Sequence, residues 1–197
     1  MNPRARLIVD ELARHRVQFE HLCRSLDPDE LKAVIPDSHW TVKDYIAHLA
    51  SIDGLIAAAF GPMVDLAYPQ PEPPLPRPFD IDDWNEGAVR QRESHDIEAL
   101  LGEAAGHRAN MAAAIERMTD ANLDLVIPYG GDRKTLGLAP TNVRFGGLLW
   151  AIAIHDPTHT QDIVRALPHR AAQPAVGEWL ASVNDSSVPE GVKEQRV

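Results

Sequence analysis

Residues 41–56 read TVKDYIAHLASIDGLI and carry the clearest structural signal in this chain. Thr41 is a helix-capping residue, and Asp44, three positions on, resembles the acidic member of a capping box. The apolar residues that follow recur at the spacing of one helix face, and they are Val42, Tyr45, Ile46, Leu49, Ile52 and Ile56. The pattern therefore predicts an amphipathic helix that continues to Gly61-Pro62.

Three further long helices are predicted around this segment. The first spans about residues 4–26, where apolar residues recur at helical spacing between charged ones. Residues 81–118 contain no proline and are rich in good helix formers, so one long helix or two helices joined near Ser94 both fit. The last long helix spans about residues 143–167 and ends before a proline.

Two long connections separate these helices. Residues 69–78 are rich in proline and are predicted to form an extended crossover loop, although a ligand for a proline-binding module also fits this composition. Residues 119–142 form a second loop, in which residues 125–127 are predicted to pair briefly as a strand. Four helices without a clear series of strands predict an all-α protein, an antiparallel four-helix bundle with long crossover loops. The bundle is predicted to comprise residues 1–168, and residues 169–197 are predicted to add one short helix and a flexible tail.

The composition excludes several classes of protein. Apolar residues are 44% and charged residues 24% of the 197, as in a soluble globular domain. The net charge of −10 argues against a nucleic-acid partner. The chain starts without the apolar stretch of a secretion signal, and its longest apolar stretch is too short to span a bilayer. These features predict a cytoplasmic protein that binds neither nucleic acid nor membrane.

Two histidines lie four positions apart in the last predicted helix, namely His155 and His159. They differ by only about 40° around the helix axis, so both project from the apolar stripe of that helix. His48 lies at the edge of the apolar stripe of the second helix. Three neutral imidazoles that converge from two helices would hold a divalent metal ion and leave positions open for water and substrate. The alternative, that all three are hydrogen-bonded core residues, also fits the spacing.

Other residues near this pair bear on the same hypothesis. Pro157 lacks an N–H and leaves the carbonyl of Ala153 without its usual partner, which predicts a kink or a local widening of the helix. Asp156 and Asp162 are each predicted to be an acceptor for an imidazole or a solvated helix charge. Cys23 is predicted to be a buried, inert thiol. The remaining histidines are predicted to be surface or capping residues: His15, His21, His39, His95, His107 and His169.

Two motifs resemble the DinB-like (YfiT-like) metalloenzyme superfamily. Trp40-Thr-Val-Lys-Asp-Tyr-Ile-Ala-His48 resembles its second-helix signature of a Trp, a capping Ser or Thr and an inward His. His155-Asp-Pro-Thr-His159 is similar to its His-x-x-x-His on the last bundle helix, and residues 79–92 resemble the start of the third helix in the mycothiol-dependent branch. The resemblance covers about residues 5–167. It implies a four-helix bundle, often a homodimer, with a metal triad carried by His48, His155 and His159.

The resemblance also implies a class of chemistry. A divalent ion is expected, and zinc, nickel, manganese and iron are all compatible with three imidazoles. The resulting hypothesis is a metal-dependent transferase, or a related hydrolase or isomerase, that joins a mycothiol-like or bacillithiol-like thiol to a small-molecule substrate. The alternative is a non-catalytic, stress-related bundle protein that binds a metal or a small ligand. Mycothiol-dependent maleylpyruvate isomerases have a Glu where His155 stands, so that particular activity is not implied.

Overall fold

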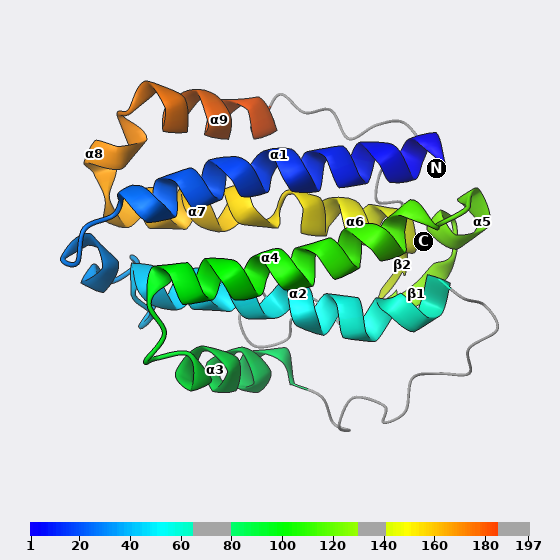
Figure 1. Ribbon diagram of the computed structural model, residues 1–197, viewed down its shortest axis with the longest axis horizontal. Helices are drawn as coiled ribbons and strands as arrows, with labels where there is room; N and C mark the ends of the chain where they lie inside the picture. The colour runs from blue at the N-terminus through cyan, green and yellow to red at the C-terminus, as the bar shows by residue number, and fades with distance from the viewer. Residues whose placement is uncertain (65–79, 130–140, 185–197) are drawn as a thin grey trace.

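The computed structural model describes residues 1–64, 80–129 and 141–184, and within them the chain is mostly helical, as predicted (Figure 1). The proline-rich crossover loop, the glycine-rich part of the second loop and the predicted flexible tail lie outside the described residues.

Four long helical segments lie side by side and make up most of the described structure. They are α1 (Pro3–Ser25), α2 (Val42–Val64), α4 (Ile97–Glu116), and α6 (Phe145–Ala153) followed directly by α7 (His155–Ala166). The most extensive contact is between α2 and α4, while α1 packs on α4, α6 and α7. In Figure 1, α1 and α6–α7 run in one direction, and α2 and α4 run in the other.

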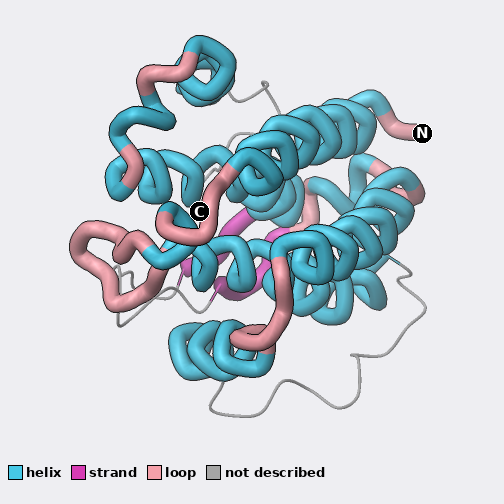
Figure 2. Tube along the Cα trace, turned by 60° about the vertical axis from the view of Figure 1, so that its left-hand side comes forward, coloured by secondary structure: helices cyan, strands magenta, loops and turns pink. Residues whose placement is uncertain are grey.

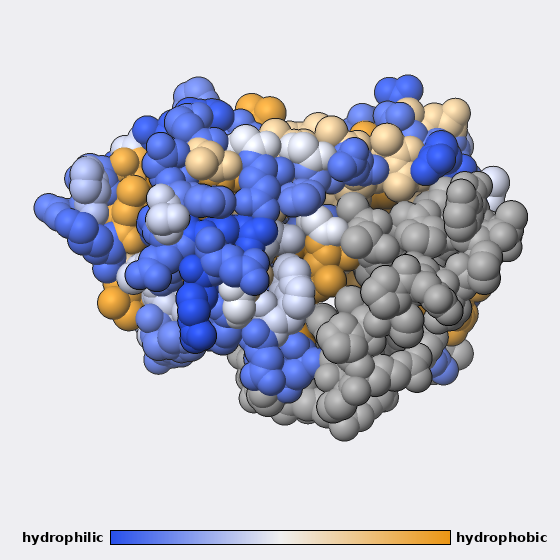
Figure 3. Space-filling model, turned by 60° about the horizontal axis from the view of Figure 1, so that its bottom comes forward, coloured by the Kyte–Doolittle hydropathy of each residue, from blue (hydrophilic) through white to orange (hydrophobic). Residues whose placement is uncertain are grey.

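The predicted third helix is divided in two, one of the alternatives that the sequence allowed. The shorter part, α3 (Ile81–Gln91), packs against α2 and lies outside the four long segments in the ribbon of Figure 1 and in the tube of Figure 2. The longer part is α4, which begins after the N-cap residue Asp96. On the face that carries α3, the described residues are mainly hydrophilic (Figure 3). None of the described helices is long and apolar enough to cross a membrane.

Short elements complete the described structure. They are η1 (Glu30–Lys32), α5 (Asp120–Leu123), β1 (Val126–Tyr129), β2 (Thr141–Arg144), α8 (Pro168–Ala171) and α9 (Pro174–Asn184). The two strands pair antiparallel, with Ile127 opposite Val143, so the strand predicted near residues 125–127 is present. Because Thr141–Arg144 pair with β1, the last long helical segment begins at Phe145, two residues later than predicted.

The capping box predicted at the start of α2 is present. The Asp44 carboxylate accepts the backbone N–H of Thr41 at 2.8 Å, and the Thr41 hydroxyl accepts the backbone N–H of Asp44 at 3.2 Å. Two backbone donors that the first helical turn cannot satisfy are thereby paired. This cap fixes where α2 begins and therefore fixes the position of His48 along it.

The buried core falls into two apolar clusters. The first lies where α9, α7 and the first halves of α2 and α4 meet the second half of α1, and it includes Phe19 and Ala104. The second includes Leu12, Met111 and Phe145 and is formed by α6, the hairpin and the opposite halves of the same long helices. Along α1 the buried residues pass from the second cluster to the first between Leu12 and Phe19. Along α4 they pass from the first cluster to the second between Ala104 and Met111.

A ring of four buried charges, the charged layer, lies at the boundary between the two apolar clusters. Its members are Arg16 of α1, Asp53 of α2, Arg108 of α4 and Asp156 of α7, and both aspartates are fully buried. Asp53 Oδ2 accepts from Arg16 Nη2 at 2.9 Å and from Arg108 Nε at 2.8 Å. Asp156 Oδ1 accepts from Arg16 Nη2 at 3.0 Å and from Arg108 Nη2 at 3.1 Å. Each long segment thus contributes one charge.

Two sequence-based predictions need correction. Asp156 is neither a solvated charge nor hydrogen-bonded to an imidazole, because both arginines of the charged layer hold its carboxylate. His15 is not a surface residue: it is fully buried, and its Nδ1 accepts the indole N–H of Trp179 at 2.8 Å, which ties α9 to α1. Neither pairing has a local signal, because every partner lies on another helix: Arg108 is 48 residues from Asp156 in the chain, and Arg16 and Trp179 are more than 100 residues from their partners.

Candidate metal centre

The structure brings His48, His155 and His159 together. One ring nitrogen of each lies within 4.8 Å of a ring nitrogen of both others. The Nε2 atoms of His155 and His159 are 3.0 Å apart. The ring centroid of His48 is 5.5 Å from that of His155 and 5.0 Å from that of His159. The convergence predicted from helix faces is therefore present between α2 and α7.

Burial keeps two of these rings neutral. The pKa of His48 is lowered to about 3, mainly by burial and then by His159, while an interaction with the Asn85 side chain partly opposes the shift. Burial also holds the pKa of His155 well below its usual value, and His159 and His48 add to the effect. Neutral imidazole is the form that binds a metal ion, so at neutral pH protons do not compete for these nitrogens.

The hydrogen bonding of the triad distinguishes the two hypotheses for these histidines, a metal site and a set of hydrogen-bonded core residues. A hydrogen-bonded core histidine needs a well-formed partner for its ring nitrogens. Among the described residues, Nδ1 of His48, of His155 and of His159 has none. The Nε2 atoms of His155 and His159 are 3.0 Å apart. At this distance their two lone pairs point at each other unless a proton or a cation lies between them. This donor set fits a divalent metal ion better than it fits a satisfied core.

Aromatic side chains flank the triad. The Trp40 ring lies 5.5 Å from the ring of His48, and the Tyr45 ring lies edge-on to His159 at 5.2 Å. The Trp40 indole N–H donates to Glu86 of α3 at 2.9 Å, which fixes the orientation of the indole. The Trp40 motif found in the sequence therefore belongs to the immediate surroundings of the histidines.

Asp162 lies beside His159, which favours the first of its two predicted alternatives, an acceptor for an imidazole. Its Oδ2 lies 3.7 Å from Nδ1 of His159, one turn along α7. The interaction with His159 is the main reason why the pKa of Asp162 is lowered. A carboxylate beside the second ring nitrogen of a metal-binding histidine typically orients the ring and increases its basicity.

The structure shows how the chain accommodates Pro157 between two inward histidines. The helix ends at Ala153, and a new one, α7, begins at His155. Pro157 is thus the third residue of α7, in the first turn, where a missing backbone N–H breaks no hydrogen bond. The perturbation predicted at the proline is present, but as a break one turn earlier. His155 projects from the first turn of α7 and His159 from the second.

The remaining candidates have structural roles. Cys23 is buried, and burial raises the pKa of its thiol, as expected for an inert cysteine. His39 lies 2.7 Å from Glu86, and His169 lies 2.6 Å from Glu30. Sequence reasoning missed Arg16, Asp53, Arg108 and Asn85, since an isolated charged or amide residue in a helical pattern does not reveal a partner on another helix.

Comparison with known proteins gives one family. A family model described as the DinB superfamily matches residues 11–163, a span that contains all three histidines and the whole charged layer. No curated protein and no solved structure matches the chain.

Proposed function

We propose a metal-dependent enzymatic function for this chain, which belongs to the DinB superfamily. In this proposal His48, His155 and His159 hold a divalent ion, within the antiparallel four-helix bundle and homodimer that the family resemblance implied. The observation that carries the proposal is the convergence of three imidazoles whose nitrogens lie within 4.8 Å of one another. Zinc, nickel, manganese and iron all accept such ligands.

The residues around the triad suit a reaction at a bound thiol or water. When bound, a divalent ion lowers the pKa of a thiol or water at the site and supplies it as a nucleophile at neutral pH. His48 and His155 stay unprotonated because desolvation lowers the pKa of each ring, and Asp162 orients His159. Trp40 and Tyr45 shield the rings from water on their sides of the site.

The proposed reaction is transfer of a low-molecular-weight thiol, mycothiol-like or bacillithiol-like, to a small electrophile. The sulfur forms a bond to the electrophilic carbon, the leaving group departs with the bonding electrons, and the thiol proton passes to solvent. Support comes from residues 79–92, which resemble the mycothiol-dependent branch in sequence. The described part of this segment is mostly α3, whose Glu86 holds Trp40 beside His48.

Metal content is the first test. Protein purified without a His-tag and supplemented with zinc, nickel or manganese is expected to hold about one ion per chain. His159→Ala should lose most of it, while the control His21→Ala, a change at an exposed position of α1, should not. A wild-type protein without near-stoichiometric metal would contradict the proposal. If metal is bound, cysteine and a chromogenic electrophile test turnover, and binding without turnover indicates the non-catalytic alternative.

A further inference from the structure

Two complementary polar atoms beside the triad lack a well-formed hydrogen bond. They are the Nδ1 of His48 and the Oδ1 of Asn85, and both are buried. An unpaired buried polar atom destabilises the folded protein, so each of the two atoms is expected to have a partner in the working protein. The Asn85 side chain lies close enough to His48 to act against the lowering of the His48 pKa, although the structure contains no hydrogen bond between these two atoms.

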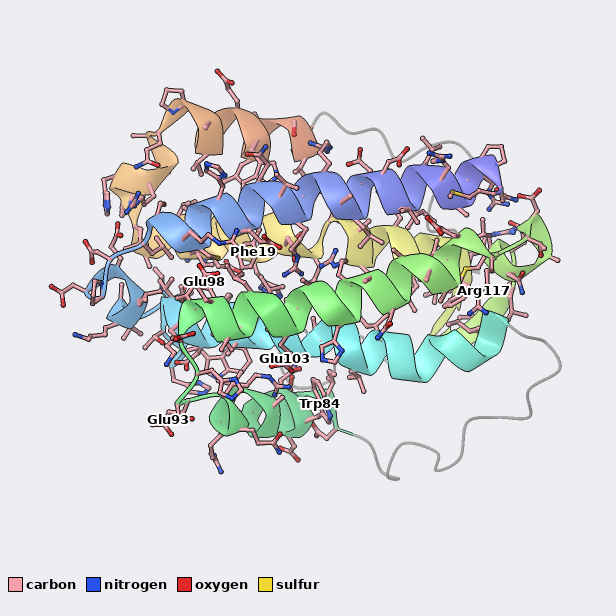
Figure 4. All side chains as sticks on the ribbon, viewed as in Figure 1. Phe19, Trp84, Glu93, Glu98, Glu103 and Arg117 are labelled. Carbon is pink, nitrogen blue, oxygen red and sulfur yellow. The ribbon has the colours of Figure 1, made fainter. Side chains whose placement is uncertain are left out.

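The placement of Asn85 is fixed by both of its neighbours in α3. Trp84 packs against the second apolar cluster, and Figure 4 shows it between α3 and α2. Glu86 accepts the indole N–H of Trp40, whose ring is 5.5 Å from His48. With Trp84 and Glu86 both held against the rest of the protein, the side chain between them stays beside His48.

The chemistry of imidazole gives this contact a direction. A neutral imidazole carries one N–H, and the other nitrogen has the lone pair that binds a metal ion. Metal-binding histidines almost always donate the remaining N–H to a carboxylate or carbonyl oxygen, which fixes the tautomer and the ring orientation. The amide oxygen of Asn85 is such an acceptor, and Asp162 lies near His159 in the corresponding way at 3.7 Å.

We propose that Asn85 is the positioning residue of His48. Its Oδ1 accepts the N–H of His48 Nδ1, and this bond holds the tautomer in which Nε2 faces His155 and His159. The inference rests on the proposed function, since an orienting partner matters only if the triad binds a metal ion. It assigns to α3 a direct part in building the site.

Two substitutions separate orientation from packing. Asn85→Leu keeps the size of the side chain and removes the acceptor, so zinc affinity, measured by competition with a chelating dye, should fall about 10- to 100-fold. Asn85→Asp keeps an acceptor and should bind zinc at least as tightly as the wild type. Metal-free Asn85→Leu should keep the circular dichroism spectrum of the wild type, because leucine fills the same space, so a loss of zinc affinity would report the missing acceptor rather than a misfolded protein. Asn110→Leu, at an exposed position of α4, is the control and should leave affinity unchanged.

A spectroscopic measurement reads the tautomer directly. Long-range proton–nitrogen NMR spectra of the zinc-loaded protein should show the His48 proton on Nδ1 in the wild type and in Asn85→Asp. The inference is overturned if Asn85→Leu binds zinc as tightly as the wild type, or if Asn85→Asp loses as much affinity as Asn85→Leu. Neither result would contradict the proposal that the triad of the wild type binds a metal ion. Failure of the wild type to bind zinc, nickel or manganese would instead refute the proposed function and remove the basis for an orienting role.

Discussion

Replacing Arg108 by methionine would remove one of the two cations of the charged layer. Arg108 donates to Asp53 at 2.8 Å and to Asp156 at 3.1 Å, and these carboxylates raise its pKa even though burial opposes them. In the Arg108→Met variant, two buried carboxylates share the single guanidinium of Arg16. A methionine fills much of the same space, so the main loss is charge compensation rather than volume.

The expected cost is large relative to the stability of a domain. Breaking a buried ion pair by removing one partner typically costs about 3–5 kcal/mol. A domain is stable by only about 5–15 kcal/mol in total. For a chain of this size each kcal/mol lowers Tm by about 2–4 °C, so the variant should melt about 6–20 °C below the wild type.

The loss should also depend on pH. Burial already raises the pKa of Asp53, and removal of the Arg108 cation should raise the pKa of Asp53 further. A carboxyl group whose pKa is higher in the folded than in the unfolded state contributes stability at low pH and loses it as pH rises through the folded pKa. The deficit of Arg108→Met relative to the wild type should therefore be largest at neutral pH and should shrink toward pH 4.

Urea denaturation of the metal-free proteins, followed by circular dichroism, measures this effect. Arg117→Met is the matched control, because Arg117 is an exposed arginine at the end of the same helix (Figure 4), and it should change stability by no more than about 0.5 kcal/mol. A cost for Arg108→Met no greater than that of the control would refute the reasoning. A variant with all four charges replaced by Met and Leu should be about as stable as the wild type, or more so.

Three further predictions concern other parts of the chain. His15→Phe leaves the Trp179 indole N–H unpaired and should lower the free energy of unfolding in urea by about 1–3 kcal/mol. Because burial lowers the pKa of His15, the wild type should lose the stability that neutral His15 contributes only as pH falls below 6.5, the ordinary pKa of histidine. The hydrogen bond with Arg170 lowers the pKa of Glu30 to about 2, so the stability that the ionised Glu30 carboxylate contributes is present above pH 4.5 and is lost as pH falls toward 2. Glu30→Gln should therefore flatten the dependence of the urea midpoint on pH in that range. An unchanged curve would contradict the role of this carboxylate. Pro157→Ala supplies an N–H for the carbonyl of Ala153, so α6 and α7 should join into one continuous helix and His155 should shift. Zinc affinity should then fall about tenfold or more with little loss of stability. Equal zinc affinity would show that the break between α6 and α7 does not depend on the proline.

The sequence predicts the helices well because their signals are local. The stripe of α2, its capping box and the inward faces of His155 and His159 all follow from the 3.6-residue period and from short-range hydrogen bonds. Convergence of His48 with the other two required one further step, the packing of α2 against α7, which the Trp40 motif supported by resemblance.

The features that escaped prediction depend on partners far away in the chain. Arg16, Asp53 and Arg108 look like ordinary helix charges until three other helices surround them. Asn85 gives no signal alone, because its role depends on where α3 packs. Val143 and Arg144, the second half of β2, were assigned to a helix, because their pairing with β1 leaves no signal in the local sequence pattern. Pro157 marked a perturbation correctly, but only the structure shows that the break precedes it.

The charged layer also bears on the register of the long segments. If one segment slid by a helical turn, its charge would move about 5.4 Å along the axis and enter an apolar cluster without a partner. We infer that the layer excludes such misaligned assemblies, and that the variant with four apolar replacements would show more than one set of NMR signals for the core. Asp156 directly follows His155, so the same four charges that align the helices also hold His155 level with His48.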